Sequence, residues 1–232
     1  MQNPRDVSSR PRRAYDASRR QAEASARQRR VVDAARELFL QRGYGATTIG
    51  DIAEAADVSV PSVYAAFESK AGILSRVVET AITGEETAPP VFEHPAGRAI
   101  LAEPDLTKRL RTVVQLLRRS HERAAPLIQL VESARASDAA LGALAETIDA
   151  SLQHDAQLFI EALPTKALRR DITRQEAADL LSVLCAARNW TTLVEHCGWT
   201  PEQYERRMAE IISRLLLQGQ SASAPTRSKS AR

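Results

Sequence analysis

The segment from residue 27 to residue 74 constrains the fold of this chain more than any other. Its apolar residues first recur every three or four positions, which predicts an amphipathic helix with one buried face. That face consists of Val31, Val32, Ala35, Leu38 and Phe39. Gly43 follows directly, and glycine adopts the left-handed conformation of a helix C-cap without steric cost. We therefore expect the helix to end at Gly43.

A second, shorter helix is predicted from Thr48 to about Ala56. Thr48 and Asp51 stand three residues apart, as in a capping box in which Asp replaces the usual Glu. Asp57 then falls in a turn whose second position is often left-handed, a conformation that aspartate tolerates at some cost. A short helix followed by a tight turn is typical of the first half of a helix-turn-helix.

Ser59 can cap a third helix that extends to Phe67, with Pro61 in its first turn, where the missing N–H does no harm. Val63 and Phe67 are four residues apart, so both would face the core. A fourth helix would start with Lys70. The outward face of the third helix would carry Val60, Pro61, Ser62 and Ala65.

These residues at these spacings resemble the DNA-binding domain of the TetR family of bacterial regulators. The resemblance covers residues 31–78, roughly a fifth of the chain. Asp57 stands where the family usually has Gly, and Gly50 stands where a polar or basic residue is common, which removes a possible DNA contact. The matching motifs are A-A-x-x-L-F at 34–39, G-Y-x-x-T-T-I at 43–49, I-A at 52–53, V-S at 58–59, V-Y-x-x-F at 63–67 and S-K at 69–70.

The resemblance implies an all-α protein of about nine helices. A three-helix helix-turn-helix DNA-binding domain over residues 26–70 would precede a larger helical domain for ligand binding and dimerisation over 71–217. We expect a loop with four prolines over about 84–104 and a helix break at Pro126. A helix over about 174–197 is apolar on more than one face, which indicates burial on both sides.

A second subunit is a natural cover for such a helix. The resemblance implies a homodimer formed through the last two helices. Two-fold symmetry would let two helix-turn-helix units read a palindromic operator in double-stranded DNA.

The predicted recognition helix is unusually apolar. Arg, Asn and Gln, the residues that read bases through paired hydrogen bonds, are absent from residues 59–67. We expect Val60, Pro61 and Ala65 to touch thymine methyl groups. Ser62 would contact a base or a phosphate. Specificity would then rest partly on the shape and deformability of the DNA.

Phosphate contacts are implied by the resemblance for Tyr64 and Lys70. Thr48 would also bind a phosphate, because the start of the second helix offers free N–H groups and a favourable dipole. Tyr64 has an alternative role, in which its ring packs against the core and only its hydroxyl reaches the rim.

Positive charge gathers at the two ends of the chain. Residues 1–30 contain nine arginines and three acidic residues, and residues 218–232 contain three basic residues and no acid. Both ends are poor in large apolar residues, so we expect a disordered basic arm over 1–25 and a disordered tail over 218–232. The arm could enter the minor groove beside the helix-turn-helix, or it could only raise nonspecific phosphate affinity. The minor-groove candidates are Arg10, Arg12, Arg13, Arg19 and Arg20.

An effector site is implied only by the resemblance. Its best sequence signal is a polar residue on an apolar helix stripe, as His121, Asp155 and Arg188 are, while Trp190 could line a pocket. Each has a plainer explanation: a hydrogen-bonded core histidine, an Asp–Arg pair that fixes register, and a tryptophan in the core or an interface.

Other classes of function have little support in the sequence. The four histidines and two cysteines form no HExxH, CxxC or Gly-rich phosphate loop, so we expect no enzyme, cofactor or metal site. No apolar run is long enough to span a membrane and the N-terminus lacks the apolar core of a secretory signal, so a cytoplasmic location is expected.

The sequence thus predicts a homodimeric transcriptional regulator, a repressor that a small-molecule effector releases from DNA. The effector would favour a dimer whose two helix-turn-helix units are wrongly spaced for the operator. Two alternatives stay open. One is a thiol-redox-responsive regulator in which Cys185 or Cys197 forms a bond between subunits, and the other is a helical adaptor whose helix-turn-helix binds protein.

Overall fold

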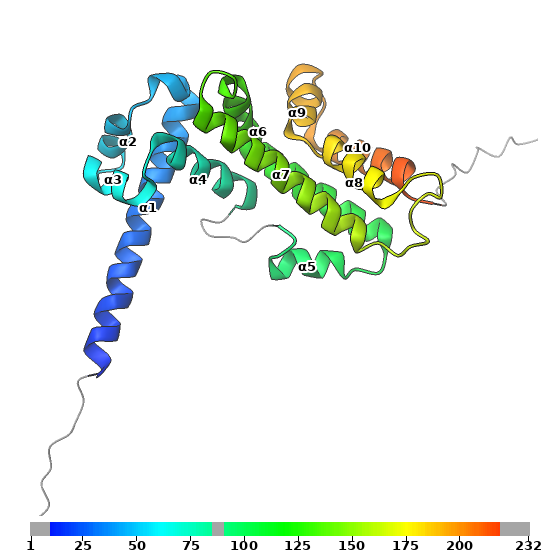
Figure 1. Cartoon of the computed structure of the whole chain (residues 1–232), viewed down its shortest axis with the longest axis horizontal. Coiled ribbons are helices and arrows are strands. Elements are labelled where there is room, and N and C mark those ends of the chain that lie inside the picture. The colour runs from blue at the N-terminus through cyan, green and yellow to red at the C-terminus, as the bar shows by residue number, and fades with distance from the viewer. Residues whose placement is uncertain (1–9, 85–90, 219–232) are drawn as a thin grey trace, which may run out of the picture. The chain divides into compact units, whose positions relative to one another are not determined.

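The computed structural model describes the backbone of residues 10–84 and 91–218, and the side chains of these residues from residue 19 onward. The described residues form ten α-helices and one π-helical stretch, with no strand, so the predicted all-α fold is confirmed (Figure 1). None of the described helices is both long and apolar enough to cross a membrane.

The chain divides into two compact units, an N-terminal unit of Met1–Glu79 and a C-terminal unit of Thr80–Arg232. The N-terminal unit contains α1 (Arg10–Ala46), α2 (Ile49–Ala55), α3 (Val60–Phe67) and most of α4 (Lys70–Thr83). This unit includes the first turns of α4 and extends to Glu79, whereas the DNA-binding domain is predicted to end at residue 70. Its fully buried side chains include Phe39, Ile52, Val63, Ile73 and Leu74.

Helix α1 ends its regular course where the sequence predicts. Gly43 has a φ of +79° and a ψ of 165°, so it has the expected positive φ in an extended conformation that glycine adopts readily, and the chain turns there. The start of α1 differs from the prediction, because residues 10–25 are helical and the expected disorder is wrong for them. Alanine, arginine and glutamine are good helix formers, and the packed part of α1 already supplies the helix nucleus.

Parts of the predicted arm and tail lie outside the described residues. These are residues 1–9, residues 219–232 and the side chains of Arg10, Arg12 and Arg13.

The C-terminal unit is built around α6 (Leu106–Ala134), which packs against α7, α9 and α10. Its core combines aromatic and aliphatic side chains from all of these helices. The other elements are α5 (Pro95–Leu101), α7 (Ala139–Glu161), α8 (Arg174–Leu184), α9 (Ala187–Trp190), the π-helical stretch η1 (Thr191–His196) and α10 (Pro201–Leu216).

Two predictions about proline are wrong. Pro126 lies inside α6, which continues through it as one helix, and the short helix α5 occupies the end of the expected proline loop. Pro126 is exposed, so α6 loses one backbone hydrogen bond on its solvent side while its other face remains packed. Pro95 starts α5, where His94 is the N-cap.

The helix predicted over 174–197 is broken in the structure. Helix α8 ends at Leu184, and Ala186 adopts an extended conformation with φ −67° and ψ 139° before α9 begins. The side-chain amide of Asn189 donates hydrogen bonds to the carbonyls of Val183 (2.7 Å) and Leu184 (3.0 Å). This amide satisfies carbonyls that the break leaves without helical partners, and so stabilises the break.

Candidate nucleic-acid interface

The turn between α2 and α3 has the geometry of a helix-turn-helix. The backbone N–H and the hydroxyl of Thr48 donate to the Asp51 carboxylate (2.8 and 2.7 Å), and the Asp51 N–H donates to the Thr48 hydroxyl (3.1 Å). The predicted capping box is therefore confirmed. Asp57 has a φ of +52°, so the left-handed turn position is confirmed as well.

Helix α3 is oriented as its sequence predicts. Ser59 caps it, with the Ser62 N–H donating to the Ser59 hydroxyl at 3.4 Å, and Val63 is buried. The predicted outward residues Val60, Pro61, Ser62 and Ala65 are all exposed. Tyr64 is 50% exposed, so its ring does not form part of the core. The outer surface of α3 is thus a mostly apolar ridge with one serine and one tyrosine.

The hydroxyl of Ser62 lies 2.7 Å from that of Ser59. A serine hydroxyl has one donor and two acceptor positions, so this bond leaves Ser62 able to form another with DNA. Ala66 is also exposed, and the sequence analysis did not assign it a place on the outer face. Its exposure shows that the ridge is one residue wider than predicted.

Lys70 forms hydrogen bonds and a ring contact within the N-terminal unit. Its Nζ donates to the carbonyls of Tyr44 (2.8 Å) and Thr47 (3.0 Å), and lies 4.2 Å from the centre of the Tyr44 ring. The ammonium therefore ties the loop after α1 to the start of α4. One of its three protons remains for a phosphate. The phosphate role stays a prediction. The structural role has no signal in the sequence, because it depends on the path of the loop.

Thr48 is poorly placed to bind a phosphate. Its N–H and its hydroxyl both donate to Asp51. The hydrogen bonds from the Thr48 side chain and backbone hold the pKa of Asp51 below its ordinary value, so this carboxylate is charged at neutral pH. A negative charge at the start of α2 offsets the attraction that the helix dipole would exert on an anion.

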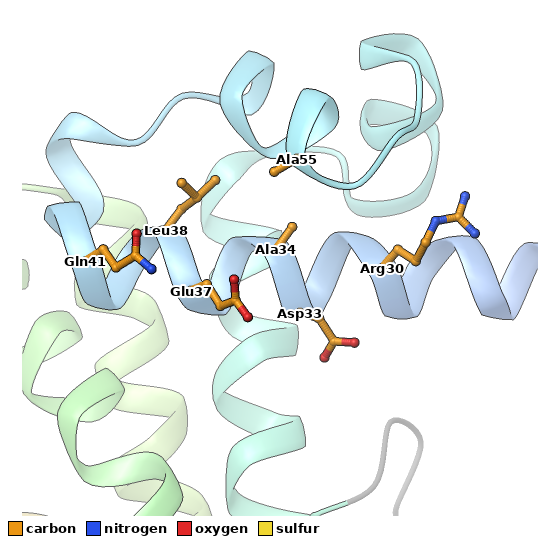
Figure 2. A pocket seen from close by; sticks show the side chains of 7 residues that line it. All are labelled: Arg30, Asp33, Ala34, Glu37, Leu38, Gln41 and Ala55. Atoms are coloured by element: carbon orange, nitrogen blue, oxygen red, sulfur yellow. The ribbon is translucent and has the colours of Figure 1, made fainter.

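A shallow surface pocket of about 310 Å³ lies between α1 and α2. Figure 2 shows side chains from one side of α1 around it, with Ala55 of α2 opposite. Arg30, at the edge of the pocket, donates from Nε to the carbonyl of Ala56 at 3.0 Å. The pocket identifies the face of α1 that is turned toward the helix-turn-helix. Its lining residues are Arg30, Asp33, Ala34, Glu37, Leu38, Gln41 and Ala55.

The predicted minor-groove arm needs revision. Arg19 and Arg20 lie on the regular helix α1 with exposed side chains, and Arg19 lies 3.7 Å from Glu23. An α-helix with its side chains is about 10–12 Å across, whereas the minor groove is about 6 Å wide. Arginines carried on such a helix do not enter the minor groove as an extended arm would.

Two of the four candidate effector residues come together in the C-terminal unit. His121 and Trp190 are buried, with ring centroids 6.2 Å apart, and Tyr204 completes an aromatic cluster. The His121 ring bonds to the Cys185 backbone, and its Nδ1 lies 3.3 Å from the Tyr204 hydroxyl. Burial lowers the pKa of His121 to about 4, so the ring is neutral at physiological pH. Tyr204 is not among the residues predicted for an effector site.

The other two candidates lie elsewhere. Asp155 is on α7, where burial raises its pKa to about 6 and the backbone of Phe92 bonds to it. Its Oδ1 is buried and has no hydrogen-bond partner among the described residues. Arg188 is exposed on α9. No contact in the described part of the chain joins this carboxylate to this guanidinium, so the suggested Asp–Arg pair does not form.

Comparison with known proteins identifies the N-terminal unit. Residues 31–77 match the model of the bacterial regulatory proteins of the tetR family. This match assigns residues 31–77 to a DNA-binding domain of the tetR type. Over 59 residues it is 39% identical to the HTH-type transcriptional repressor BdcR of Escherichia coli K12. That match covers 25% of this chain and 29% of BdcR, so the chain matches less than a third of the length of this relative.

Several solved structures have a similar fold over most of the chain. One is a protein of Syntrophomonas wolfei described as a TetR-family transcriptional regulator, with a TM-score of 0.65, 18% identity, and coverage of 80% of this chain and 92% of its own. NalD, the secondary repressor of the MexAB-OprM multidrug efflux pump in Pseudomonas aeruginosa, has a TM-score of 0.62 and 19% identity, with 83% and 97% covered. A transcriptional regulator of Saccharomonospora viridis, solved with choline, has a TM-score of 0.60 and 20% identity, with 83% and 98% covered.

Proposed function

We propose that this protein is a sequence-specific DNA-binding transcriptional regulator that acts as a repressor in the cytoplasm. The observation that carries the proposal is the exposed face of α3, presented by a capped α2 and a left-handed turn at Asp57. Its four predicted reading residues are all exposed, although two of them are aliphatic and one is a proline. Apolar side chains on the outside of a short helix are costly in water, and a ligand surface accounts for them.

The apolar ridge of α3 fits the floor of a major groove rich in thymine. Val60, Pro61 and Ala65 would contact thymine methyl groups, and Ser62 would bond to a base or a phosphate. The Tyr64 hydroxyl, at the exposed end of its ring, would donate to a phosphate. We expect Ser62→Ala to change which sequence is preferred and Tyr64→Phe to weaken binding to all sequences alike.

Dimerisation would bring two such helices to one operator. Leu180 and Val183 on α8 are 38% and 66% exposed, and Ile211 on α10 is 41% exposed. These three large apolar side chains come from the two helices that the sequence analysis assigned to the subunit interface. Covering them with a second copy would remove apolar surface from water, and a two-fold axis would match a palindrome.

The effector of this repressor would act on the C-terminal unit through the aromatic cluster of His121, Trp190 and Tyr204. Aromatic faces attract cations, and the relative from S. viridis binds choline, a quaternary ammonium ion. We therefore expect choline and other small organic cations to be the first ligands to test. The readout is tryptophan fluorescence in a Trp199→Phe variant, in which Trp190 is the one remaining tryptophan. Unchanged fluorescence with the whole set would remove the cluster as a cation site.

The redox alternative gains little from the structure. Cys185 is buried, and burial raises the pKa of its thiol to about 12, which keeps it in the unreactive protonated form. Cys197 is exposed and free.

The test of the proposal is selection of random duplex DNA by the full-length protein, followed by binding to the enriched duplex over a range of salt concentrations. A two-fold-symmetric motif, whose affinity falls when Tyr64 is replaced, would support the regulator. Enrichment of no motif would contradict it and favour an adaptor that binds protein.

A further inference from the structure

The helix-turn-helix of this protein carries the wrong charge for its proposed ligand. Residues 47–70 contain four acidic residues and a single lysine. That lysine, Lys70, already donates two hydrogen bonds to backbone carbonyls. The affinity of proteins for duplex DNA comes largely from cations that neutralise phosphates. The N-terminal unit therefore needs a source of positive charge outside the helix-turn-helix.

The N-terminal part of α1 supplies that charge. Residues 19–30 contain five arginines and one glutamate, and all five arginine side chains are exposed. In Figure 1 this part of α1 extends beyond α3 as a single helix. The family model begins at residue 31, so residues 19–30 lie outside the matched region.

The arginines at 20 and 27 point to the same side of α1 as the helix-turn-helix. Seven residues make almost two helical turns, so Arg20, Arg27, Ala34 and Gln41 follow one line along the helix with a drift of about 20° per step. Ala34 and Gln41 line the pocket that faces Ala55 of α2. Arg27 and Arg20 continue that line beyond the end of the bundle.

The extension offers little to a protein partner. Residues 16–30 contain no apolar side chain larger than alanine, so the helix has no apolar stripe to bury. Guanidinium groups at intervals of about 10 Å along a straight helix instead match the phosphate backbone of a duplex. A polyanion continuous with the surface bound by α3 fits both the charge and the position.

We propose that the helical extension of α1 is a second DNA contact, which binds the phosphate backbone beside the half-site read by α3 through Arg20 and Arg27. The identity of the duplex as an operator rests on the proposed function. Arg20 lies eleven residues before Val31, about 16 Å along the helix, so the contact extends the bound DNA by roughly five base pairs on each side.

The test compares two double variants of the full-length protein. Arg20→Gln with Arg27→Gln removes the two arginines on the line that faces the helix-turn-helix, and Gln preserves helix propensity. Arg29→Gln with Arg36→Gln is the matched control, with the same spacing and charge change on the opposite side of α1. Circular dichroism of both variants checks that the helix persists.

Binding is measured on a random-sequence duplex of about 40 base pairs and on the selected duplex, with and without about six flanking base pairs on each side. In a dimer the test variant loses four phosphate contacts, so its slope of log affinity against log salt should fall by about 3.6. When the salt concentration rises from 50 to 200 mM, the affinity of the wild-type protein should then fall by a factor that is roughly 150 times larger than the factor for the variant. The preference for flanked DNA should vanish in the variant and persist in the control.

Equal slopes for the test and control variants on the random duplex would overturn the proposal, whether or not a motif is selected. A selected motif together with equal slopes would leave the regulator intact and remove only the second contact. A reduced slope without any motif would support the contact and contradict the proposed function. Greater dependence on Arg20 and Arg27 for structured RNA than for duplex DNA would also overturn it.

Discussion

Replacing Lys70 by methionine should destabilise the N-terminal unit by about 2 kcal/mol, since it removes the ammonium and keeps the stem. Two hydrogen bonds from a charged donor contribute at least about 1.5 kcal/mol each in protected sites, and an exposed cation–π contact about 0.5 kcal/mol. Lys70 is half-buried, so water compensates part of this loss at the carbonyls of Tyr44 and Thr47. For a unit of this size, such a loss lowers the melting temperature by about 10 °C.

Calorimetry of the full-length protein would measure the shift, and hydrogen exchange of the loop at residues 44–47 would locate it. Lys166→Met is the control, because Lys166 is exposed in the C-terminal unit. The salt slope of DNA binding should fall by at most about 1 per protomer. Equal melting temperatures for the two variants, with unchanged exchange at the loop, would refute the structural role of Lys70.

Three further perturbations follow from the geometry. Asp57→Gly should stabilise the N-terminal unit by about 0.5–1 kcal/mol in urea unfolding, because φ is +52° there, and Asp57→Val should destabilise it. Asn189→Ala should cost about 1–2 kcal/mol, since the Leu184 carbonyl loses the amide donor and the Val183 carbonyl keeps only backbone donors, and an unchanged unfolding midpoint would contradict that role. Burial lowers the pKa of His121 below that of the unfolded chain, so stability is present above about pH 6.5 and is lost as pH falls toward 4. This loss amounts to about 3 kcal/mol, and His121→Gln should flatten the profile.

The features that the sequence predicts correctly are local ones. Gly43, the Thr48–Asp51 box and Asp57 each depend on residues within one turn, where a conformation follows from the residue type itself. The orientation of α3 also follows from local spacing, because Val63 is buried and Phe67, one turn later, is half-buried on the same side. The reading face could therefore be derived before any tertiary contact was known.

The errors concern contacts between distant residues. Lys70 reaches carbonyls 26 and 23 residues away, and no spacing rule relates such positions. The sequence carries no strong signal for the break after α8, because Ala186 and Ala187 are good helix formers. The group that stabilises the break is the side-chain amide of Asn189. The scarcity of large apolar residues in the first 25 positions predicts disorder, although residues 10–25 extend a helix for which the packed part of α1 provides the nucleus.

In the N-terminal unit, the residues proposed to read the bases and the residues proposed to neutralise the phosphates lie on different helices, so substitutions can separate specificity from affinity. The apolar face of α3 discriminates bases through methyl contacts and shape, neither of which neutralises a phosphate. The arginines of the α1 extension neutralise phosphates and carry no base information. Loss of Arg20 and Arg27 should therefore weaken binding to the operator and to random DNA by the same factor, so the ratio of the two affinities stays constant. Loss of Ser62 should change that ratio while the salt slope remains the same, and the two measurements together separate reading from anchoring.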